Sequence, residues 1–173
     1  MPTLVLSPPT LDYADDLLRF ESDNRAFFEA RINARPPGYY SPDGVRAAVL
    51  LAEQEAADDR GYQFLVRSEA GELVGRVNLI GVRRTHFQMA ELGYRFAESA
   101  GGRGYASEAV RQVCERAFGD LGLMRLEAVV RVGNEGSIKV LQRNGFREFG
   151  RSQQSFLLGG VWHDRLHFER RAP

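Results

Sequence analysis

The chain has 173 residues, of which 43% are hydrophobic and 27% charged, and its 23 basic residues balance its 23 acidic ones. This composition is typical of a globular protein, and the length predicts a single domain over residues 1–173 with a sizeable core. A net charge of zero argues against nucleic acid or an anionic membrane surface as a partner. Since no apolar run approaches the roughly 18 residues of a membrane span and the N-terminus has no signal-peptide core, we expect a cytoplasmic protein.

The first 60 residues predict mainly helices. Residues 3–6 alternate weakly and predict a short edge strand. Three helices are expected after it: one capped by Thr10, one over residues 24–31 and one that begins at Ser41, where a proline follows the cap. The segment 33–40 has no periodicity and predicts a loop.

From residue 62 the pattern changes to strands. Residues 63–67 and 72–82 predict an antiparallel hairpin, followed by a polar connection over 83–88 and a strand over 89–97. Beyond a central helix, we expect a strand over 125–132 and a short helix that starts at Asn134 or Glu135 and ends at Gly145. Extended segments are expected over 146–153 and 154–158. A turn at 159–160 then leads to a strand over 161–169, with Trp162, Leu166 and Phe168 on one face. This order predicts a mixed α/β (α+β) fold.

A glycine-rich loop precedes the central helix. Gly101, Gly102 and Gly104 stand directly before a 3.6-residue apolar stripe, made of Ala106, Ala109, Val110, Val113, Cys114, Ala117, Phe118 and Leu121. Glycines allow positive φ, and the free N–H groups of a helix N-terminus attract anions. The loop therefore predicts a phosphate or pyrophosphate site, although an ordinary turn has the same composition. The P-loop and the Rossmann fingerprint do not match.

Cys114, the one cysteine, lies on that apolar stripe. We interpret it as a structural thiol rather than a nucleophile or a metal ligand. No metal site is predicted.

Three motifs in this order resemble the GCN5-related N-acetyltransferase (GNAT) superfamily. They are Gly101-Gly102-Arg103-Gly104-Tyr105-Ala106, Asn134-Glu135-Gly136-Ser137 with Asn144-Gly145-Phe146, and Glu91-Leu92-Gly93-Tyr94. The resemblance is good over residues 62–168 and looser before them. It implies a mostly antiparallel sheet of about seven strands, splayed between the fourth and fifth and flanked by four to five helices. Within the superfamily the chain is similar to the Rim-type branch, the ribosomal-protein-alanine N-terminal acetyltransferases, which also contains members that act on small amines.

The resemblance implies acetyl-CoA as cosubstrate. Its pyrophosphate is expected on the amides of Gly102, Arg103, Gly104, Tyr105 and Ala106, with Gly101 opening the loop. Its pantetheine arm is expected to pair with the backbone near Tyr94 and Phe96, with Asn134 near its amides and Ser137 near its sulfur. Asn134 is alternatively a simple helix cap, and Ser137 a polar residue of the first turn.

Acetyl transfer to a neutral amine needs positioning and a proton acceptor, but no covalent enzyme intermediate. Glu91 is the candidate base, acting directly or through water; alternatively it is only a charge at the start of a strand. Two positions depart from the family pattern. Gly101 stands where Gln or Arg is usual, and Leu141 replaces a tyrosine that protonates the leaving thiolate in many relatives. Ser137, Tyr105 or solvent is then expected to act as the acid.

The acceptor pocket is expected among the least periodic segments: Phe27, Phe28, residues 33–40, residues 83–88 and the final hairpin. His86 is a candidate there, although a solvated loop histidine is the simpler interpretation, and Trp162 is expected in the core or in a pocket wall. With pKa values of ~7.8 for an α-amine and ~10.4 for lysine, about a third of the former is neutral at pH 7.5, which favours an α-amine.

The leading hypothesis is therefore acetylation of a protein N-terminus. The alternatives are acetylation of a small amine such as a polyamine, an amino acid or an aminoglycoside, or a cofactor-binding module without catalysis. A homodimer is compatible with the resemblance.

Overall fold

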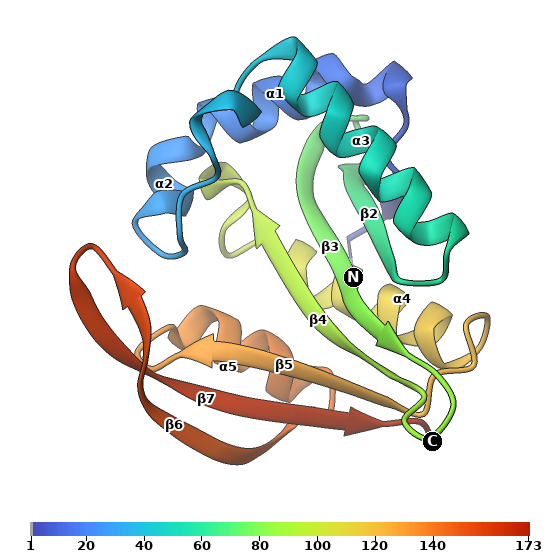
Figure 1. Cartoon of the computed structure of the whole chain (residues 1–173), viewed down its shortest axis with the longest axis vertical. Coiled ribbons are helices and arrows are strands. Elements are labelled where there is room, and N and C mark those ends of the chain that lie inside the picture. The colour runs from blue at the N-terminus through green and yellow to red at the C-terminus, as the bar shows by residue number, and fades with distance from the viewer. Residues whose placement is uncertain (1) are drawn as a thin grey trace.

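The computed structural model describes residues 2–173, which form a mixed sheet with helices on both faces (Figure 1). The sheet has seven strands in the order β1-β2-β3-β4-β5-β7-β6. Their bounds are β1 Leu4–Ser7, β2 Gly61–Ser68, β3 Leu73–Arg83, β4 Met89–Phe96, β5 Arg125–Arg131, β6 Arg147–Leu158 and β7 Val161–Arg171. Neighbouring strands are antiparallel except β4 and β5, which are parallel. The mixed fold class predicted from the sequence is confirmed.

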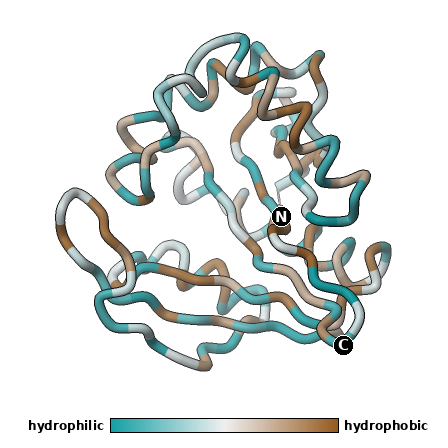
Figure 2. The backbone as a smooth tube through the Cα atoms, viewed as in Figure 1, coloured by the Kyte–Doolittle hydropathy of each residue, from teal (hydrophilic) through white to brown (hydrophobic). Residues whose placement is uncertain are grey.

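Two groups of helices cover the two faces. The first group is α1 Ala14–Asp23, α2 Arg25–Glu29 and α3 Pro42–Ala57, and the second is α4 Tyr105–Phe118 and α5 Glu135–Arg143 (Figure 1). Short 3-10 turns lie at Leu11–Tyr13, Pro37–Tyr39 and Glu98–Ala100. Hydrophobic residues lie along the strands in Figure 2, and β2 and β3 contain runs of consecutive buried residues, as expected where helices cover both faces of a sheet. Within the described part of the chain, no helix is both long and apolar enough to cross a membrane.

The helix starts predicted from the sequence are partly correct. Ser41 caps α3 as expected, because its hydroxyl accepts a hydrogen bond from Gly44 N at 3.0 Å. Thr10 occupies the cap position of the first turn, but its side chain makes no capping hydrogen bond, so the predicted side-chain cap is wrong. The helix predicted over 24–31 is shorter than expected and ends at Glu29.

The C-terminal hairpin differs from prediction in two respects. The two extended segments form a single strand, β6, with register shifts at Glu148/Gly150 and Ser152/Phe156. Phe168 is buried as expected, whereas Trp162 is 58% exposed at the far end of β7. Trp162 is therefore not a core residue, because the tip of the hairpin extends beyond the part of the sheet that the helices cover.

The parallel pair β4–β5 separates soon after it begins. Only Met89, Ala90 and Glu91 pair with Arg125, Leu126 and Glu127, although both strands continue beyond these residues. The rest of β4 therefore faces a gap on its β5 side. This separation confirms the predicted splay between the fourth and fifth strands.

The apolar stripe of α4 packs on the sheet as predicted. Ala109, Val110, Val113, Cys114 and Ala117 are fully buried. Burial raises the pKa of the Cys114 thiol to about 11, although Arg170 nearby opposes part of that rise. This agrees with a structural role for the thiol.

We expect Cys114 to be chemically silent in the folded protein, because a buried protonated thiol is a poor nucleophile. An aromatic disulfide reagent at neutral pH should release no chromophore from the native chain and one equivalent after denaturation. Rapid labelling without denaturant would contradict this packing of α4.

Candidate functional site

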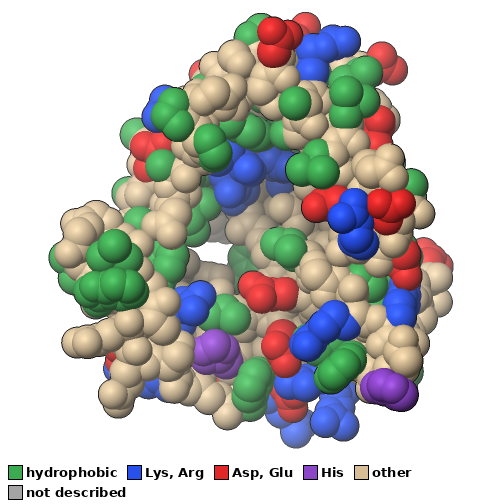
Figure 3. Space-filling model, in the orientation of Figure 1, with side chains coloured by type: hydrophobic (Ala, Val, Ile, Leu, Met, Phe, Trp, Pro, Cys, Tyr) green, Lys and Arg blue, Asp and Glu red, His purple; other side chains and the backbone are tan. Residues whose placement is uncertain are grey.

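Two cavities lie on either side of the gap between β4 and β5. The first, the glycine-loop pocket, has a volume of about 430 Å³ and lies between β4, the loop before α4, and α5. The second, the arginine pocket, has a volume of about 370 Å³ and is lined from β3, β4, β5, β7 and residues 31–33. Both are lined by Tyr94, Arg95, Asn134 and Ser137, so they meet at the gap. In Figure 3 the surface is open there, with basic side chains gathered above the opening.

The loop before α4 exposes backbone amides to the glycine-loop pocket. Gly102 and Gly104 have φ values of +72° and +78°, which a side chain would strain. A Cβ at Gly102 would meet nothing within 4 Å, so the backbone is open to a ligand there. Gly104 is the N-cap of α4, and no side chain caps this end of the helix among the described residues. The free amides and the helix dipole therefore favour an anion.

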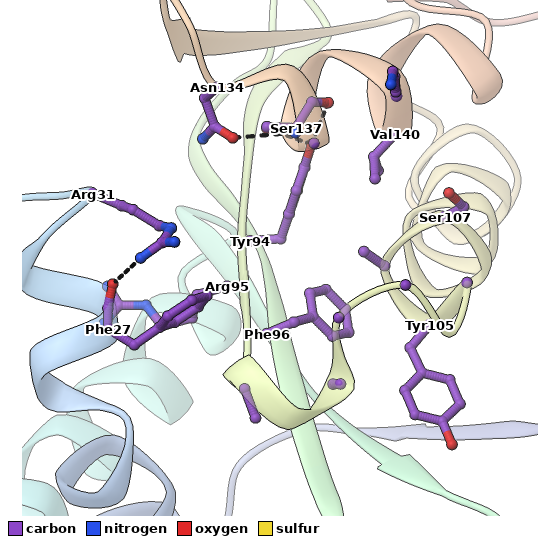
Figure 4. A pocket seen from close by; sticks show the side chains of 18 of the residues that line it. Phe27, Arg31, Tyr94, Arg95, Phe96, Tyr105, Ser107, Asn134, Ser137 and Val140 are labelled. Atoms are coloured by element: carbon purple, nitrogen blue, oxygen red, sulfur yellow. Dashed lines mark hydrogen bonds between the residues drawn. The ribbon is translucent and has the colours of Figure 1, made fainter.

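A hydrogen-bonded group connects β4 to the first turn of α5. The Tyr94 hydroxyl lies 2.8 Å from Ser137 Oγ and donates to Ser137 O at 3.1 Å. Asn134 Oδ1 accepts from Ser137 N at 3.3 Å, which makes Asn134 the side-chain cap of α5. Figure 4 shows Tyr94 pointing from β4 towards Ser137. Burial raises the pKa of Tyr94 to about 12, so its hydroxyl remains protonated at neutral pH.

Glu91 is the last residue of β4 that pairs with β5, at the start of the gap. Its exposed carboxylate lines the arginine pocket but not the glycine-loop pocket. Leu141 stands where the family resemblance leads one to expect a tyrosine. It is fully buried and offers no hydroxyl. Ser137 and Tyr94 are therefore the hydroxyl-bearing side chains that both cavities share.

The sequence interpretation missed a buried ionic cluster beside the arginine pocket. Glu21 of α1 is 0% exposed and contacts three arginines: Arg35 Nη2 at 3.1 Å, Arg76 Nη1 at 2.5 Å and Arg95 Nη1 at 2.9 Å. Burial alone would raise the pKa of Glu21, but the three positive charges outweigh it and the net pKa is lowered. The available signal was a glutamate in the apolar stripe of α1, in register with the buried Ala14 and Leu17.

The predicted site residues are largely brought together. The glycine-loop pocket is lined by Tyr94, Phe96, Gly101, Gly102, Gly104, Tyr105, Ala106, Asn134 and Ser137. Arg103 does not line it, and its guanidinium lies over the Tyr105 ring at 4.7 Å.

The segments expected around the acceptor line the two cavities only in part. Phe27 and Phe28 line the glycine-loop pocket, and Asn33 lines the arginine pocket. The 83–88 connection lies outside both cavities, because Arg84 holds it against Asp59 with N–O distances of 2.6 and 2.7 Å. His86 is exposed there, in agreement with a solvated loop histidine, and lines neither cavity.

Comparison with known proteins gives one family. The model of the acetyltransferase (GNAT) domain matches residues 3–147. The probable N-acetyltransferase YjcK of Bacillus subtilis (strain 168) is 33% identical over 163 residues, covering 94% of this chain and 90% of that protein. The spermidine N(1)-acetyltransferase of Escherichia coli (strain K12) is 25% identical, covering 78% of this chain and 73% of its own length.

Solved structures match closely in fold. The ribosomal-protein-S5-alanine acetyltransferase of Vibrio fischeri has a TM-score of 0.94 at 20% identity, covering 99% of this chain and 94% of that one. Mycobacterium smegmatis RimJ in complex with CoA-disulfide has a TM-score of 0.90 at 26% identity, covering 98% of this chain and 82% of that one.

The ionic cluster predicts a pH-dependent contribution to stability. Glu21→Gln leaves three arginines without their shared carboxylate, which should lower the free energy of unfolding by about 3–5 kcal/mol at neutral pH. Because the folded pKa of Glu21 lies below its ordinary value of 4.5, this contribution is present above the unfolded pKa. It is lost as the pH falls through the folded pKa.

Urea unfolding from neutral pH down to about pH 3.5 measures both effects. The difference between the parent chain and Glu21→Gln should shrink at the acidic end, while Glu53→Gln on the exposed face of α3 should change little at any pH. A constant difference across the range would show that Glu21 does not titrate in this way.

Proposed function

We propose that this chain, which belongs to the acetyltransferase (GNAT) family, transfers acetyl from acetyl-CoA to the α-amine of a protein N-terminus. The observation that carries the proposal is the pair of cavities that meet where β4 leaves β5. A cosubstrate in one cavity and an amine in the other can approach each other through this gap. Direct transfer needs that arrangement.

The glycine-loop pocket suits the cosubstrate. The open amides at the start of α4 would receive the pyrophosphate, and the side chains of Lys139 and Arg143 add positive charge to the same wall. The unpaired side of β4 beyond Glu91 would pair with the amides of the pantetheine arm, since backbone N–H and C=O groups require partners. Residues Tyr94 and Phe96 lie on this length of strand.

Glu91 and Ser137 serve the reaction from opposite sides of the gap. Acetyl-CoA supplies the thioester that the amine attacks. Glu91 accepts the proton that the amine must lose, directly or through a water molecule. Ser137 donates a hydrogen bond to the departing sulfur, and Tyr94 orients the Ser137 hydroxyl. In the arginine pocket, the buried Oδ1 of Asn78 lacks a hydrogen-bond partner in the described chain, and an amine N–H would satisfy it.

A small-molecule amine is the second candidate acceptor. The similarity to a spermidine acetyltransferase favours it. A polyamine is nevertheless a poor match for a cavity that four arginines and one glutamate line. The proposal therefore ranks an N-terminal α-amine first.

The proposed function predicts turnover of peptides that begin with Ala, Ser or Met. The measurement is acetyl-CoA-dependent thiol release, beside a panel of spermidine, amino acids and aminoglycosides. Turnover restricted to the small amines would refute the N-terminal acceptor. Silence on every amine, with acetyl-CoA still raising Tm, would favour a non-catalytic module.

Glu91→Gln should lower kcat/KM by about 10²–10⁴-fold, the usual contribution of a general base. The stabilisation of the chain by acetyl-CoA should remain unchanged. Glu53→Gln is the matched control, because it makes the same exchange on the exposed face of α3. Equal rates for Glu91→Gln and the parent would remove Glu91 from the mechanism.

Tyr94→Phe and Ser137→Ala should not be additive, because the tyrosine acts through the serine hydroxyl. We expect each substitution to lower kcat by about tenfold or more, and the double variant to be no slower than Ser137→Ala. Stopped-flow thiol release with saturating acetyl-CoA measures this. Multiplicative losses would mean that the two hydroxyls act independently.

A further inference from the structure

The arginine pocket concentrates positive charge in a chain whose net charge is zero. Four arginines line it, Arg31, Arg95, Arg131 and Arg165, against one carboxylate, Glu91; of the four, Arg95 also contacts Glu21 outside the pocket lining. An ammonium ion that enters such a cavity is repelled. The charge of the pocket thus needs an explanation beyond the binding of an amine.

Two pairs of arginines lie directly opposite each other across neighbouring strands. Arg76 of β3 faces Arg95 of β4, and Arg131 of β5 faces Arg165 of β7. Like charges in directly opposite positions destabilise a sheet unless something compensates them. In the first pair the compensation is internal, because Glu21 contacts both guanidinium groups.

The second pair has no such carboxylate. Among the ion pairs of residues 2–173, none includes Arg131 or Arg165. Arg165 Nε donates to Ser155 Oγ at 3.1 Å, a neutral partner. Arg131 Nε is buried with no hydrogen-bond partner in the described chain. The pair is therefore prepared for a negative charge that the protein itself does not supply.

The cosubstrate does not account for this pair. Arg131 and Arg165 line the arginine pocket but not the glycine-loop pocket, where the phosphates would bind. They line the cavity that would receive the acceptor, together with Glu91. The missing negative charge therefore belongs to the acceptor.

We propose that the acceptor carries a carboxylate close to its amine, and that Arg131 and Arg165 bind this group. This inference rests on the proposed function. The carboxylate compensates the repulsion that the ammonium meets. By pairing with this carboxylate, the arginines in turn offset the rise in the amine pKa that a nearby negative charge would otherwise cause, and so preserve the neutral nucleophile. A chain whose second or third residue is Asp or Glu fits, since an extended peptide advances only ~3.4 Å per residue.

Matched peptides test this charge requirement. Three peptides share Ser at position one and differ at positions two and three, which are Asp-Glu, Asn-Gln or Lys-Lys; free aspartate and glutamate form a separate arm. We expect kcat/KM for the acidic peptide to exceed that for the neutral one by about 10- to 100-fold, the range of a charge-assisted hydrogen bond. Equal values for acidic and neutral peptides overturn the inference while leaving N-terminal acetylation intact.

The free amino acids separate the inference from the proposed function. If aspartate and glutamate are turned over but none of the peptides is, the result supports the carboxylate requirement and refutes a protein N-terminus as the acceptor. Preference for the Lys-Lys peptide or for spermidine overturns the inference. An N-acetylated acidic peptide, which cannot react, should still raise Tm in the presence of CoA, whereas its Asn-Gln counterpart should not.

Variants assign the effect to the proposed residues. Arg165→Gln and Arg131→Gln should each reduce the acidic-to-neutral preference by about tenfold, mainly through KM. Arg165→Glu should shift the preference towards the Lys-Lys peptide, which a loss of folding cannot imitate. Arg46→Gln, an exposed site on α3, is the control and should leave the preference unchanged. A uniform fall in kcat for all peptides would assign these arginines to the chemical step and overturn the inference.

Discussion

The separation of β4 from β5 is the constraint on which the rest of the structure depends. Backbone groups of a buried strand need partners, so a sheet that opens after Glu91 leaves one side of β4 to be satisfied from outside. Three residue pairs still join β4 to β5, and beyond them the Tyr94 hydroxyl reaches Ser137 on the helix that follows β5. The gap is therefore bridged by this contact. The glycine-loop pocket and the arginine pocket exist because of the gap.

One buried carboxylate, that of Glu21, organises much of the charge beside this gap. Glu21 comes from α1, and its contacts with Arg76 and Arg95 tie the first helical layer to the two central strands. Burying a carboxylate is unfavourable unless it is paired, and here one carboxylate compensates three guanidinium groups. The excess positive charge that remains lies towards the arginine pocket. A single buried side chain thus contributes to the packing of the helices and to the electrostatics of the arginine pocket, which Arg95 lines.

Local signals in the sequence predicted local features well. The glycines before α4, the stripe that contains Cys114 and the cap at Ser41 each depend on a few neighbouring residues, and the structure agrees with all three. The Glu21 cluster joins residues 14 to 74 positions apart, so a local window could show a glutamate in the apolar stripe of α1 but not the arginines that pair with it. Trp162 was misjudged as a core or wall residue for the same reason, whereas the exposure of His86 agrees with a solvated loop histidine. Their exposure depends on where the β6–β7 hairpin and the 83–88 connection lie, and neither location is set by the residues themselves.

The replacement of a tyrosine by Leu141 is compatible with the proposed chemistry. An alkyl thiol such as cysteine has a pKa of ~8.5, so at neutral pH departure as a thiolate costs only ~1–2 pKa units, or about 2 kcal/mol. A hydroxyl with the pKa of Tyr94, about 12, would not readily transfer its proton to such a group. Hydrogen bonding to the sulfur reduces that cost without any proton transfer. Ser137, supported by Tyr94, can provide this bond from the first turn of α5, so position 141 is free to fill the core.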